Sequence, residues 1–388
     1  MSQLDHTSKR IIIIGGGIAG LSIAVRLSQA GLPVTVLETS TLGFGASTRN
    51  QGWLHSGAWF AISQPELAKK CYQSLLKTLK YCPDCIEPHH TGTAYLITQP
   101  ETLVTEWTSA WNECGIPFEI LEHDDLKKAL PGIAEQEIQH AFLLSDRSIR
   151  VDLLIQQLAA TAENGGVEIR TETHVDKLLR KDDNITGVLL SSGEELTAQL
   201  VILAGGGAGM RLDPDSFPER IGEQHESKLV PLKTHLVAVS PDVGHLPLCL
   251  VDEGGFCHMP HAPQSVFGSN HWLTVASGVD NELVPQEIDQ IWKNINRFFP
   301  SVDREKETVR EWAGTTIQAM QAHQIEPGKA PLPTVIDHCQ ESPVINHLVS
   351  IYPGRATLWA DVAETAFQTV MEKLEYHPRT CTCPPWEG

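Results

Sequence analysis

No stretch of this sequence approaches the roughly 20 consecutive apolar residues that a membrane-spanning helix needs. The first apolar run, Ile11–Ile14, enters a glycine turn after four residues and is too short for a signal peptide. Residues 1–8 are expected to form a short disordered leader. We therefore expect a cytoplasmic protein with no integral membrane segment.

Basic residues are scarce. Lys and Arg number 29 against 48 Asp and Glu, which gives a formal net charge of −19. A net charge of this sign argues against nucleic acid and anionic membrane surfaces as partners. It does not argue against an anionic substrate, because local positive charge in a pocket can override the net charge.

A disulfide framework is also missing. The chain has nine cysteines, an odd number, and no secretory signal, so free thiols are expected. Cys82 and Cys85 form C-x-x-C, and Cys381 and Cys383 form C-x-C. A four-thiolate metal site, a redox-active dithiol and incidental thiols all remain open. Because this spacing is not a standard zinc pattern, no metal site is predicted.

The segment from Lys9 to Glu38 carries the strongest positive signal. Four consecutive isoleucines, Ile11–Ile14, predict a buried parallel strand. Apolar residues spaced three and four apart then predict a helix over Ile18–Gln29, and a second strand is expected over Pro33–Leu37. This is the order of elements in a nucleotide-binding βαβ unit.

Three glycines join the first predicted strand to the helix as G-x-G-x-x-G. Gly15 allows the tight turn, Gly17 lets backbone approach a pyrophosphate, and Gly20 lets the helix pack against the strand. The helix N-terminus offers free N–H groups and partial positive charge to phosphates. Glu38 lies where a carboxylate can accept both ribose hydroxyls, which disfavours a 2′-phosphate. Further cofactor contacts are expected from Ile18, Ala19 and Thr39. This fingerprint alone does not separate FAD from NAD.

The loop at residues 43–60 is rich in Gly, Ser, Thr and Asn and carries a histidine between aromatic residues. This composition suits a loop that runs along a pyrophosphate towards a planar ring. Asn50, Gly52, His55 and Gly57 make the pattern N-x-G-x-x-H-x-G. With this pattern the chain resembles the D-amino-acid oxidase-like FAD oxidoreductase superfamily. Within it, the motif is most similar to L-2-hydroxyglutarate dehydrogenases and, more distantly, FAD-linked glycerol-3-phosphate dehydrogenases.

The resemblance implies that FAD is the cofactor and that this loop passes the flavin. It makes His55 the leading catalytic candidate, because histidine is the commonest general base. The alternative is a structural histidine that fixes the loop. The flavin contacts implied within the loop are Ser47, Thr48, Asn50, Gln51 and Gly52.

A second glycine signature follows the apolar run Leu200–Leu203. Ala204, Gly205 and Gly206 would bring backbone close to a ligand, and the segment resembles the family's second flavin motif. The alternative is an ordinary glycine-rich strand end. Met210 stands where a third glycine of a second fingerprint would be needed, so electrons are expected to enter from the substrate. By the same resemblance, Val175 contacts adenine through its backbone.

A third motif lies near the C-terminus. Gly354, Arg355, Ala356 and Thr357 resemble the family's G-[KR]-x-T turn. In the family, the helix N-terminus that follows faces the flavin's C2 carbonyl and stabilises negative charge on the reduced ring. Arg355 is therefore a catalytic candidate that serves either the flavin or an acidic substrate. Simple N-capping by Thr357 is the alternative.

The middle of the chain is predicted to be a β-rich substrate domain. Lys233 and His258 are weak candidates for the substrate pocket, since relatives place side chains of this sheet over the flavin. A metal trio of His258, His261 and His271 has no motif spacing. After Gly314 this chain has threonines where many relatives have an arginine, so a carboxylate clamp is missing there.

The predicted fold is α/β, or α+β overall, with a Rossmann-like FAD-binding domain and a second, antiparallel-sheet substrate domain. This is the architecture of D-amino-acid oxidase-like proteins. The FAD-binding domain is predicted over 9–90, 150–228 and 340–376, the substrate domain over 91–149 and 229–339, and tails over 1–8 and 377–388.

The predicted function is FAD-dependent oxidation of a small 2-hydroxy acid or polyol phosphate. Hydride would pass to flavin N5 while His55 accepts the hydroxyl proton. Oxygen, a quinone or another carrier would then accept the electrons. One alternative is an amine or amino-acid oxidase of the same superfamily, of the glycine, sarcosine or D-amino-acid type. Another is a flavoprotein that has lost catalysis and serves as a binding module.

Overall fold

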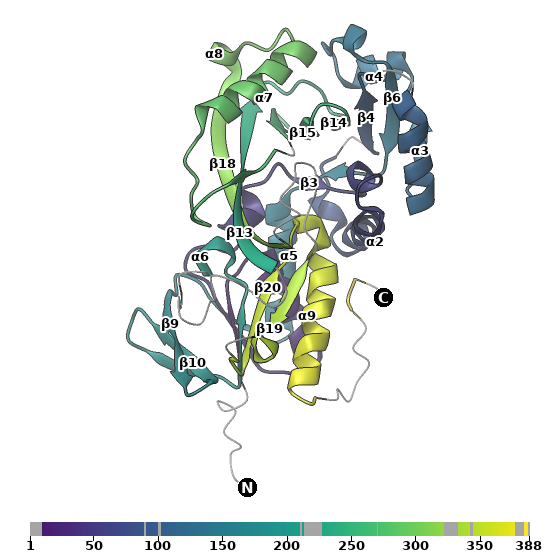
Figure 1. Cartoon of the computed structure of the whole chain (residues 1–388). Coiled ribbons are helices and arrows are strands. Elements are labelled where there is room, and N and C mark those ends of the chain that lie inside the picture. Colours follow the sequence, from purple (N-terminus) through teal and green to yellow (C-terminus); the bar gives the residue numbers. More distant parts are fainter. Residues whose placement is uncertain are drawn as a thin grey trace.

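A computed structural model gives the arrangement of the chain. It describes residues 10–88, 91–99, 102–209, 212, 227–269, 271–321, 333–341, 344–376 and 384–386. Met210, Cys381 and Cys383, which entered the sequence predictions, lie outside the described residues. The molecule has two bodies, one above the other in Figure 1.

The lower body is built on a six-stranded sheet whose central strands are parallel. In spatial order its strands are β19 (Thr334–Asp337), β20 (Leu348–Tyr352), β12 (Leu200–Leu203), β1 (Ile11–Ile14), β2 (Val34–Leu37) and β8 (Glu168–Arg170). Only the edge strand β19 runs antiparallel to its neighbour. β19 lies within the range 229–339 that was assigned to the substrate domain, yet it extends the lower sheet. The domain division itself stays a prediction.

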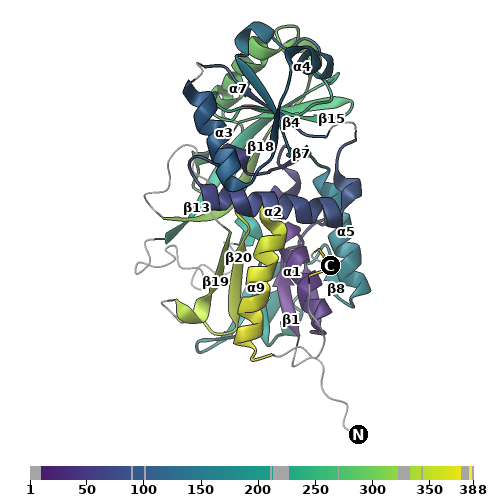
Figure 2. The ribbon, with the colours of Figure 1, turned by 90° about the vertical axis from the view of Figure 1, so that its right-hand side faces the viewer.

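The predicted strand Ile11–Ile14 is buried on both faces, as a parallel strand between covering layers should be. Ile11 and Ile13 face three helices that lie side by side in Figure 2, and Ile12 and Ile14 face a three-stranded sheet. The helices are α1 (Ile18–Gln29), α5 (Val151–Asn164) and α9 (Trp359–Lys373). The small sheet is β9 (Val175–Lys181), β10 (Asn184–Leu190) and β11 (Glu195–Thr197).

The upper body is a nine-stranded sheet with helices around it. Its strands in spatial order are β17 (Leu273–Thr274), β13 (Ser227–Val239), β16 (Gln264–Gly268), β15 (Cys257–His261), β14 (Leu248–Leu250), β4 (Thr93–Ile97), β6 (His140–Leu144) and β5 (Phe118–Ile120), with β18 (Thr308–Gln321) paired to β13. The sheet is antiparallel as predicted, except that β14 runs parallel to β4. The longer helices here are α3 (Thr102–Cys114), α4 (His123–Ala129) and α7 (Pro285–Phe298), and α8 (Arg304–Glu307) is a single turn.

Several elements join the two bodies. The long antiparallel pair β13 and β18 descends from the upper sheet towards β20 (Figure 1). Helix α2 (Pro65–Tyr81) lies across the top of α9 and reaches α3 (Figure 2). Short elements complete the junction: β3 (Trp53–Leu54), β7 (Arg147–Ser148) and α6 (Gly206–Gly209). Single 3-10 turns occur at Ala46–Thr48, Ala58–Phe60, Pro83–Cys85, Glu135–Glu137, His338–Gln340 and Ala356–Leu358. None of the helices in the described part of the chain is both long enough and apolar enough to cross a bilayer.

Candidate functional site

Two adjoining pockets lie at the carboxyl ends of β1, β12 and β20, where open α/β sheets bind ligands. We call the one beside Gly15, Gly17 and Ala204 the glycine cleft. The other, beside His55 and Arg355, is called the histidine pocket. The residues that line both are Ile18, Ala46, Ser47, Arg49, Thr315, Thr316 and Pro353. One elongated ligand can therefore occupy both pockets.

Two of the fingerprint glycines, Gly15 and Gly20, make the close backbone approaches that their spacing predicts. Gly15 has φ +111°, and a Cβ there would lie 2.5 Å from the carbonyl oxygen of Ala204. A Cβ at Gly20 would overlap the carbonyl oxygen of Gly15, so only glycine lets α1 approach β1 this closely. Gly17 lines the open cleft, and the nearest atom to a Cβ there is the Ser47 hydroxyl, at 3.0 Å. A side chain at Gly17 would thus project into the open cleft.

Glu38 lies at the end of β2 and lines the glycine cleft. Its two carboxylate oxygens accept hydrogen bonds from the backbone N–H of Gly16 at 2.7 Å and of Ser40 at 2.9 Å. These bonds fix the carboxylate in the position where the fingerprint expects a ribose. The cleft is also lined by the other predicted contacts on this side, which are Ile18, Ala19, Thr39, Val175, Gly205 and Gly206.

The loop that carries the second motif is folded by its own polar side chains. Asn50 accepts from the N–H of Gly52 at 2.8 Å and donates to the carbonyl of Ser47 at 2.7 Å. Asn50, Ser47 and Gln51 line the histidine pocket, as the flavin-contact prediction requires. Thr48 and Gly52 instead line a separate pocket on the far side of the loop, and the Thr48 hydroxyl donates to the carbonyl of Gly43.

His55 is 6% exposed and its ring stacks on Trp53 with a centroid separation of 4.0 Å. Its backbone N–H donates to the hydroxyl of Thr357 at 3.1 Å. Burial, and next the charge of Arg355, lower the pKa of His55 well below its ordinary value, so the imidazole is neutral near pH 7. Its Nδ1 is buried and has no hydrogen-bond partner among the described residues. Because buried polar atoms are normally paired, this nitrogen fits a bound ligand.

Asp146 holds the segment around His55 and was not predicted from the sequence. Its buried carboxylate accepts from Trp53 Nε1 at 2.8 Å, from the N–H of Ser56 at 2.6 Å and from the hydroxyl of Tyr95 at 2.6 Å. It therefore fixes the residues on both sides of His55, including the ring that stacks on the imidazole. Asp146 lies two residues after the end of the strand β6, which is a weak signal in the sequence, and its role is evident only from its contacts in the fold.

Arg355 lies in the wall of the histidine pocket, with its guanidinium carbon 4.5 Å from the ring centroid of Phe60. Burial lowers the pKa of Arg355 to about 10, so the side chain remains a cation at neutral pH. Gly354 has φ +69°, as a tight turn before a helix requires. The Thr357 hydroxyl accepts the hydrogen bond from the N–H of His55. The N-cap position of α9 makes no side-chain capping hydrogen bond.

The two weak substrate candidates do not line the histidine pocket. Lys233 Nζ donates to Asp280 Oδ1 and to the carbonyl of Glu282, both at 3.0 Å. Its strand neighbour Thr234 faces the pocket instead, because successive side chains of a strand point to opposite faces. His258 Nε2 lies 2.8 Å from the hydroxyl of Ser265, within the core of the upper body.

Three residues that line the histidine pocket were not predicted from the sequence: Arg49, Thr234 and Trp272. Thr315 and Thr316, the threonines that follow Gly314, also line it. Across the described residues, no group of three or more His, Cys, Asp or Glu is arranged to hold a metal ion. Cys82 and Cys85 are buried free thiols.

The chain matches a family model. The model of the FAD dependent oxidoreductase family, DAO, covers residues 10–335. A subunit of the anaerobic glycerol-3-phosphate dehydrogenase of Haemophilus influenzae is 25% identical and is aligned over 98% of this chain and 68% of its own length. A glycine oxidase of Pseudomonas aeruginosa is 23% identical and is aligned over 79% of this chain and 82% of its own length.

Solved structures show the same fold. Glycine oxidase from Geobacillus kaustophilus superposes with a TM-score of 0.71 and 20% identity, covering 97% of this chain and 98% of its own. L-alpha-glycerophosphate oxidase from Mycoplasma pneumoniae, with FAD bound, gives a TM-score of 0.70 and 18% identity, covering 98% and 97%. These matches confirm the resemblance to the D-amino-acid oxidase-like superfamily, and with it the fold and the cofactor inferred from the motifs. The chain belongs to the FAD dependent oxidoreductase (DAO) family and is an FAD-dependent oxidoreductase.

Proposed function

We propose that this enzyme oxidises a small anionic substrate, either a polyol phosphate or a 2-hydroxy acid. The reactive carbon of such a substrate carries both a hydrogen and a hydroxyl. The similarity to the glycerol-3-phosphate dehydrogenase of Haemophilus influenzae, over nearly the whole of this chain, supports this class. Within this chain, one observation carries the proposal. A buried neutral imidazole with an unpaired Nδ1 shares a pocket with a buried guanidinium.

His55 is the proposed general base. A neutral imidazole can take the hydroxyl proton at Nδ1, and the lowered pKa keeps the ring neutral until that transfer. The stacked ring of Trp53 and the hydrogen bond from His55 N–H to Thr357 fix its orientation. Bound FAD supplies the hydride acceptor, and the chain supplies position and electrostatics.

We assign the glycine cleft to the nucleotide half of FAD and the histidine pocket to the flavin half. The residues proposed to hold the nucleotide half are Gly15, Gly17, Ile18, Ala19, Glu38, Thr39, Val175, Ala204, Gly205 and Gly206. Gly20 contributes indirectly, because it lets α1 approach β1 closely. The residues proposed to hold the flavin half are Ser47, Asn50, Gln51, Gly354, Arg355, Ala356 and Thr357. Thr48 and Gly52 line the pocket on the far side of the loop, so any effect they have on the flavin is indirect, through the shape of the loop.

Arg355 supplies the positive charge of the site. It lies in the turn that opens onto α9, and the helix N-terminus adds partial positive charge in the same direction. We propose that this charge stabilises the reduced flavin, and that capture of a substrate carboxylate or phosphate is its competing role.

Amine or amino-acid oxidation is the second candidate. It is supported by the glycine oxidase of Pseudomonas aeruginosa, which aligns with 79% of this chain. The two classes differ in their products. Oxidation of a primary amine releases ammonia after hydrolysis of the imine, and oxidation of a secondary amine such as sarcosine releases an amine, whereas oxidation of an alcohol releases neither.

Dye-coupled turnover with matched substrate pairs tests the proposal. The pairs are glycerol 3-phosphate with glycerol, a 2-hydroxy acid with its amide, and glycine with ethanolamine, each assayed for ammonia. The proposal predicts activity with an anionic alcohol, loss of activity with its neutral partner, and no ammonia. Activity confined to amines, with ammonia released, would establish the second candidate. Comparing oxygen, a quinone and a dye as oxidants then identifies the electron acceptor.

A further inference from the structure

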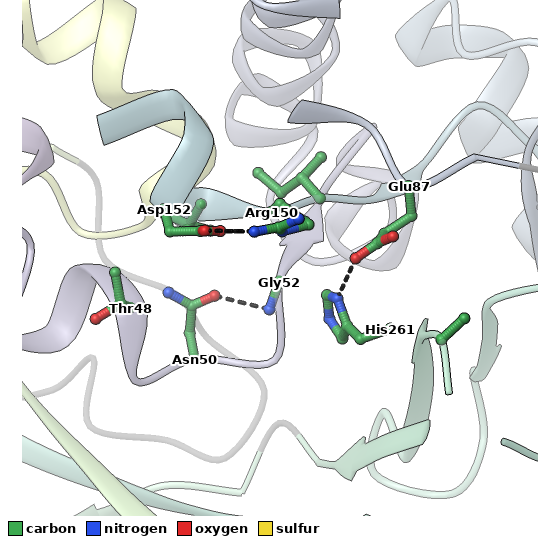
Figure 3. Close-up of a pocket in the computed structure, with 10 residues that line it drawn as sticks. Thr48, Asn50, Gly52, Glu87, Arg150, Asp152 and His261 are labelled. Atoms are coloured by element: carbon green, nitrogen blue, oxygen red, sulfur yellow. Dashed lines mark hydrogen bonds and ion pairs between the residues drawn. The ribbon is translucent and has the colours of Figure 1, made fainter. Parts of the chain in front are cut away.

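The separate pocket that Thr48 and Gly52 line is polar and lies on the far side of the loop that carries Asn50, Gln51 and Gly52 (Figure 3). Its walls come from that loop, from the segment before β4, from the start of α5 and from the end of β15. The labelled residues in Figure 3 are Thr48, Asn50, Gly52, Glu87, Arg150, Asp152 and His261. The loop thus separates this pocket from the histidine pocket, which Asn50 also lines.

His261 makes a hydrogen bond with each of its ring nitrogens. Nδ1 lies 2.7 Å from Glu87 Oε1, and Nε2 lies 2.9 Å from the carbonyl oxygen of Gln51. A carbonyl oxygen only accepts, so Nε2 must carry a proton. The other bond needs a proton on Nδ1 or on the carboxyl group. Both ring nitrogens of His261 therefore have polar partners, one in the loop and one in Glu87.

His261 contacts residues 51 and 52 of the loop from the side opposite the histidine pocket. Gly52 has φ +71°, and a Cβ there would lie 2.7 Å from the His261 ring, so the two are in close contact. The Gly52 carbonyl accepts from the N–H of Ile149 at 2.8 Å. Consecutive carbonyls of the loop are thus fixed, and the one at Gln51 depends on His261.

We propose that His261 and Glu87 are positioning residues for FAD: the pair holds the Gln51 carbonyl and keeps residues 50–52 in the shape that binds the flavin. Loss of either hydrogen bond of His261 loosens the loop. The inference rests on the proposed placement of Asn50 and Gln51 beside the flavin. It concerns cofactor affinity, so it does not depend on the substrate.

The other charged groups that face His261 belong to α5. Arg150 and Asp152 line the same pocket, and Arg150 Nη2 lies 2.7 Å from Asp152 Oδ2. These two charges neutralise each other locally, and both side chains are half exposed to solvent. β15 and β7 face His261 with uncharged groups, where Ser148 donates to the carbonyl of Pro260. Glu87 is therefore the charge in contact with the ring.

Titration of apoprotein with FAD, for the wild type and for variants of the pair, tests this inference. His261→Phe keeps a ring beside Gly52 but removes the donor to the Gln51 carbonyl, so its dissociation constant for FAD should be about tenfold higher than that of the wild type. Glu87→Leu leaves Nδ1 without its partner and should weaken binding in the same direction. Glu87→Gln can donate to Nδ1 while Nε2–H still donates to Gln51, so its affinity should stay close to that of the wild type.

Asp152→Asn is the matched control, because it removes a carboxylate from the same pocket without touching the ring or the loop. It should keep the wild-type affinity for FAD. Wild-type FAD affinity in both His261→Phe and Glu87→Leu would overturn the inference. If these variants lower the thermal stability of apoprotein but leave FAD affinity unchanged, the pair is only structural and the inference also fails. Each result is independent of which substrate is oxidised.

Discussion

The backbone N–H of His55 donates to the hydroxyl of Thr357 at 3.1 Å, although the two residues are 302 positions apart in the chain. This bond joins the histidine loop to the turn before α9, and the hydroxyl of Ser74 in α2 donates to the carbonyl of Thr357. The proposed base and the proposed cationic turn are therefore held in one connected network. Substitutions in the histidine loop are therefore expected to affect the turn before α9, and substitutions in that turn to affect the loop.

Gly17→Val should abolish FAD binding while the apoprotein remains folded, because the added side chain occupies the cleft beside Ser47. Gly20→Ala is the contrasting change. Its methyl group would overlap the carbonyl of Gly15, so it should lower the free energy of unfolding by about 1–3 kcal/mol. FAD content after purification and urea unfolding separate the two effects. A yellow Gly17→Val protein with normal FAD content would disprove this assignment of the cleft.

His55→Ala should retain FAD and reduce the rate of flavin reduction by about 10² to 10⁴, the usual contribution of a positioned base. Stopped-flow absorbance under anaerobic conditions measures this rate. Unchanged reduction would reassign His55 to a structural role.

The pH dependence of reduction provides a separate check on His55. The neutral imidazole is the base, so reduction should slow as pH falls through the lowered pKa. Since burial and Arg355 lower that pKa, the fall should lie at more acidic pH than for an ordinary histidine. Arg355→Met removes one of the two causes, so the acid limb should move to higher pH in that variant. An acid limb at the same pH in both proteins contradicts the assignment.

Arg355→Met distinguishes the two roles of the cation. If the charge serves the flavin, the reduction potential should fall and sulfite should bind more weakly, while substrate binding is largely kept. If it captures the substrate anion, substrate affinity should collapse while the potential stays near normal, because breaking a desolvated charge pair is costly. Arg355→Lys keeps the charge without the planar fork, so it should preserve the flavin role and impair a bidentate clamp. We expect the first pattern.

Asp146→Ala should lower the free energy of unfolding by about 3 kcal/mol or more, because the donors from Trp53, Ser56 and Tyr95 lose a buried acceptor. Asp146→Asn keeps the shape but turns one acceptor into a donor, so its cost should be smaller. Urea unfolding of both variants measures the difference. Equal stability of Asp146→Ala and the wild type would show that water replaces the carboxylate.

The features that the sequence predicted best are those fixed by local chemistry. The βαβ unit is predictable because strand, glycine turn and helix follow one another, and Gly15 and Gly20 have the close approaches that their spacing requires. The turn at Gly354 is predictable for the same reason. The position of the Glu38 carboxylate, beside the N–H of Gly16, also follows from the place of this residue at the end of β2.

The features that the sequence did not predict depend on side-chain direction and long-range contacts. Lys233 and Thr234 are neighbours in β13, and only the register with β18 decides which of them faces the pocket. Thr48 and Asn50 share one loop, but its folding turns Thr48 away from the histidine pocket. Asp146 and His261 act through residues that are far away in sequence. A single sequence does not show which distant residues come together in the fold, so it carries little information on such contacts.

The most direct test of the central claim is anaerobic mixing of the purified holoprotein with a panel of hydroxy acids, polyol phosphates and amino acids. The flavin's visible absorbance is followed, and the products are identified. The account predicts that an anionic alcohol bleaches the flavin, that a ketone or aldehyde forms without ammonia, and that His55→Ala slows the bleaching. Bleaching by amines alone, with ammonia formed and no effect of His55→Ala, would contradict it.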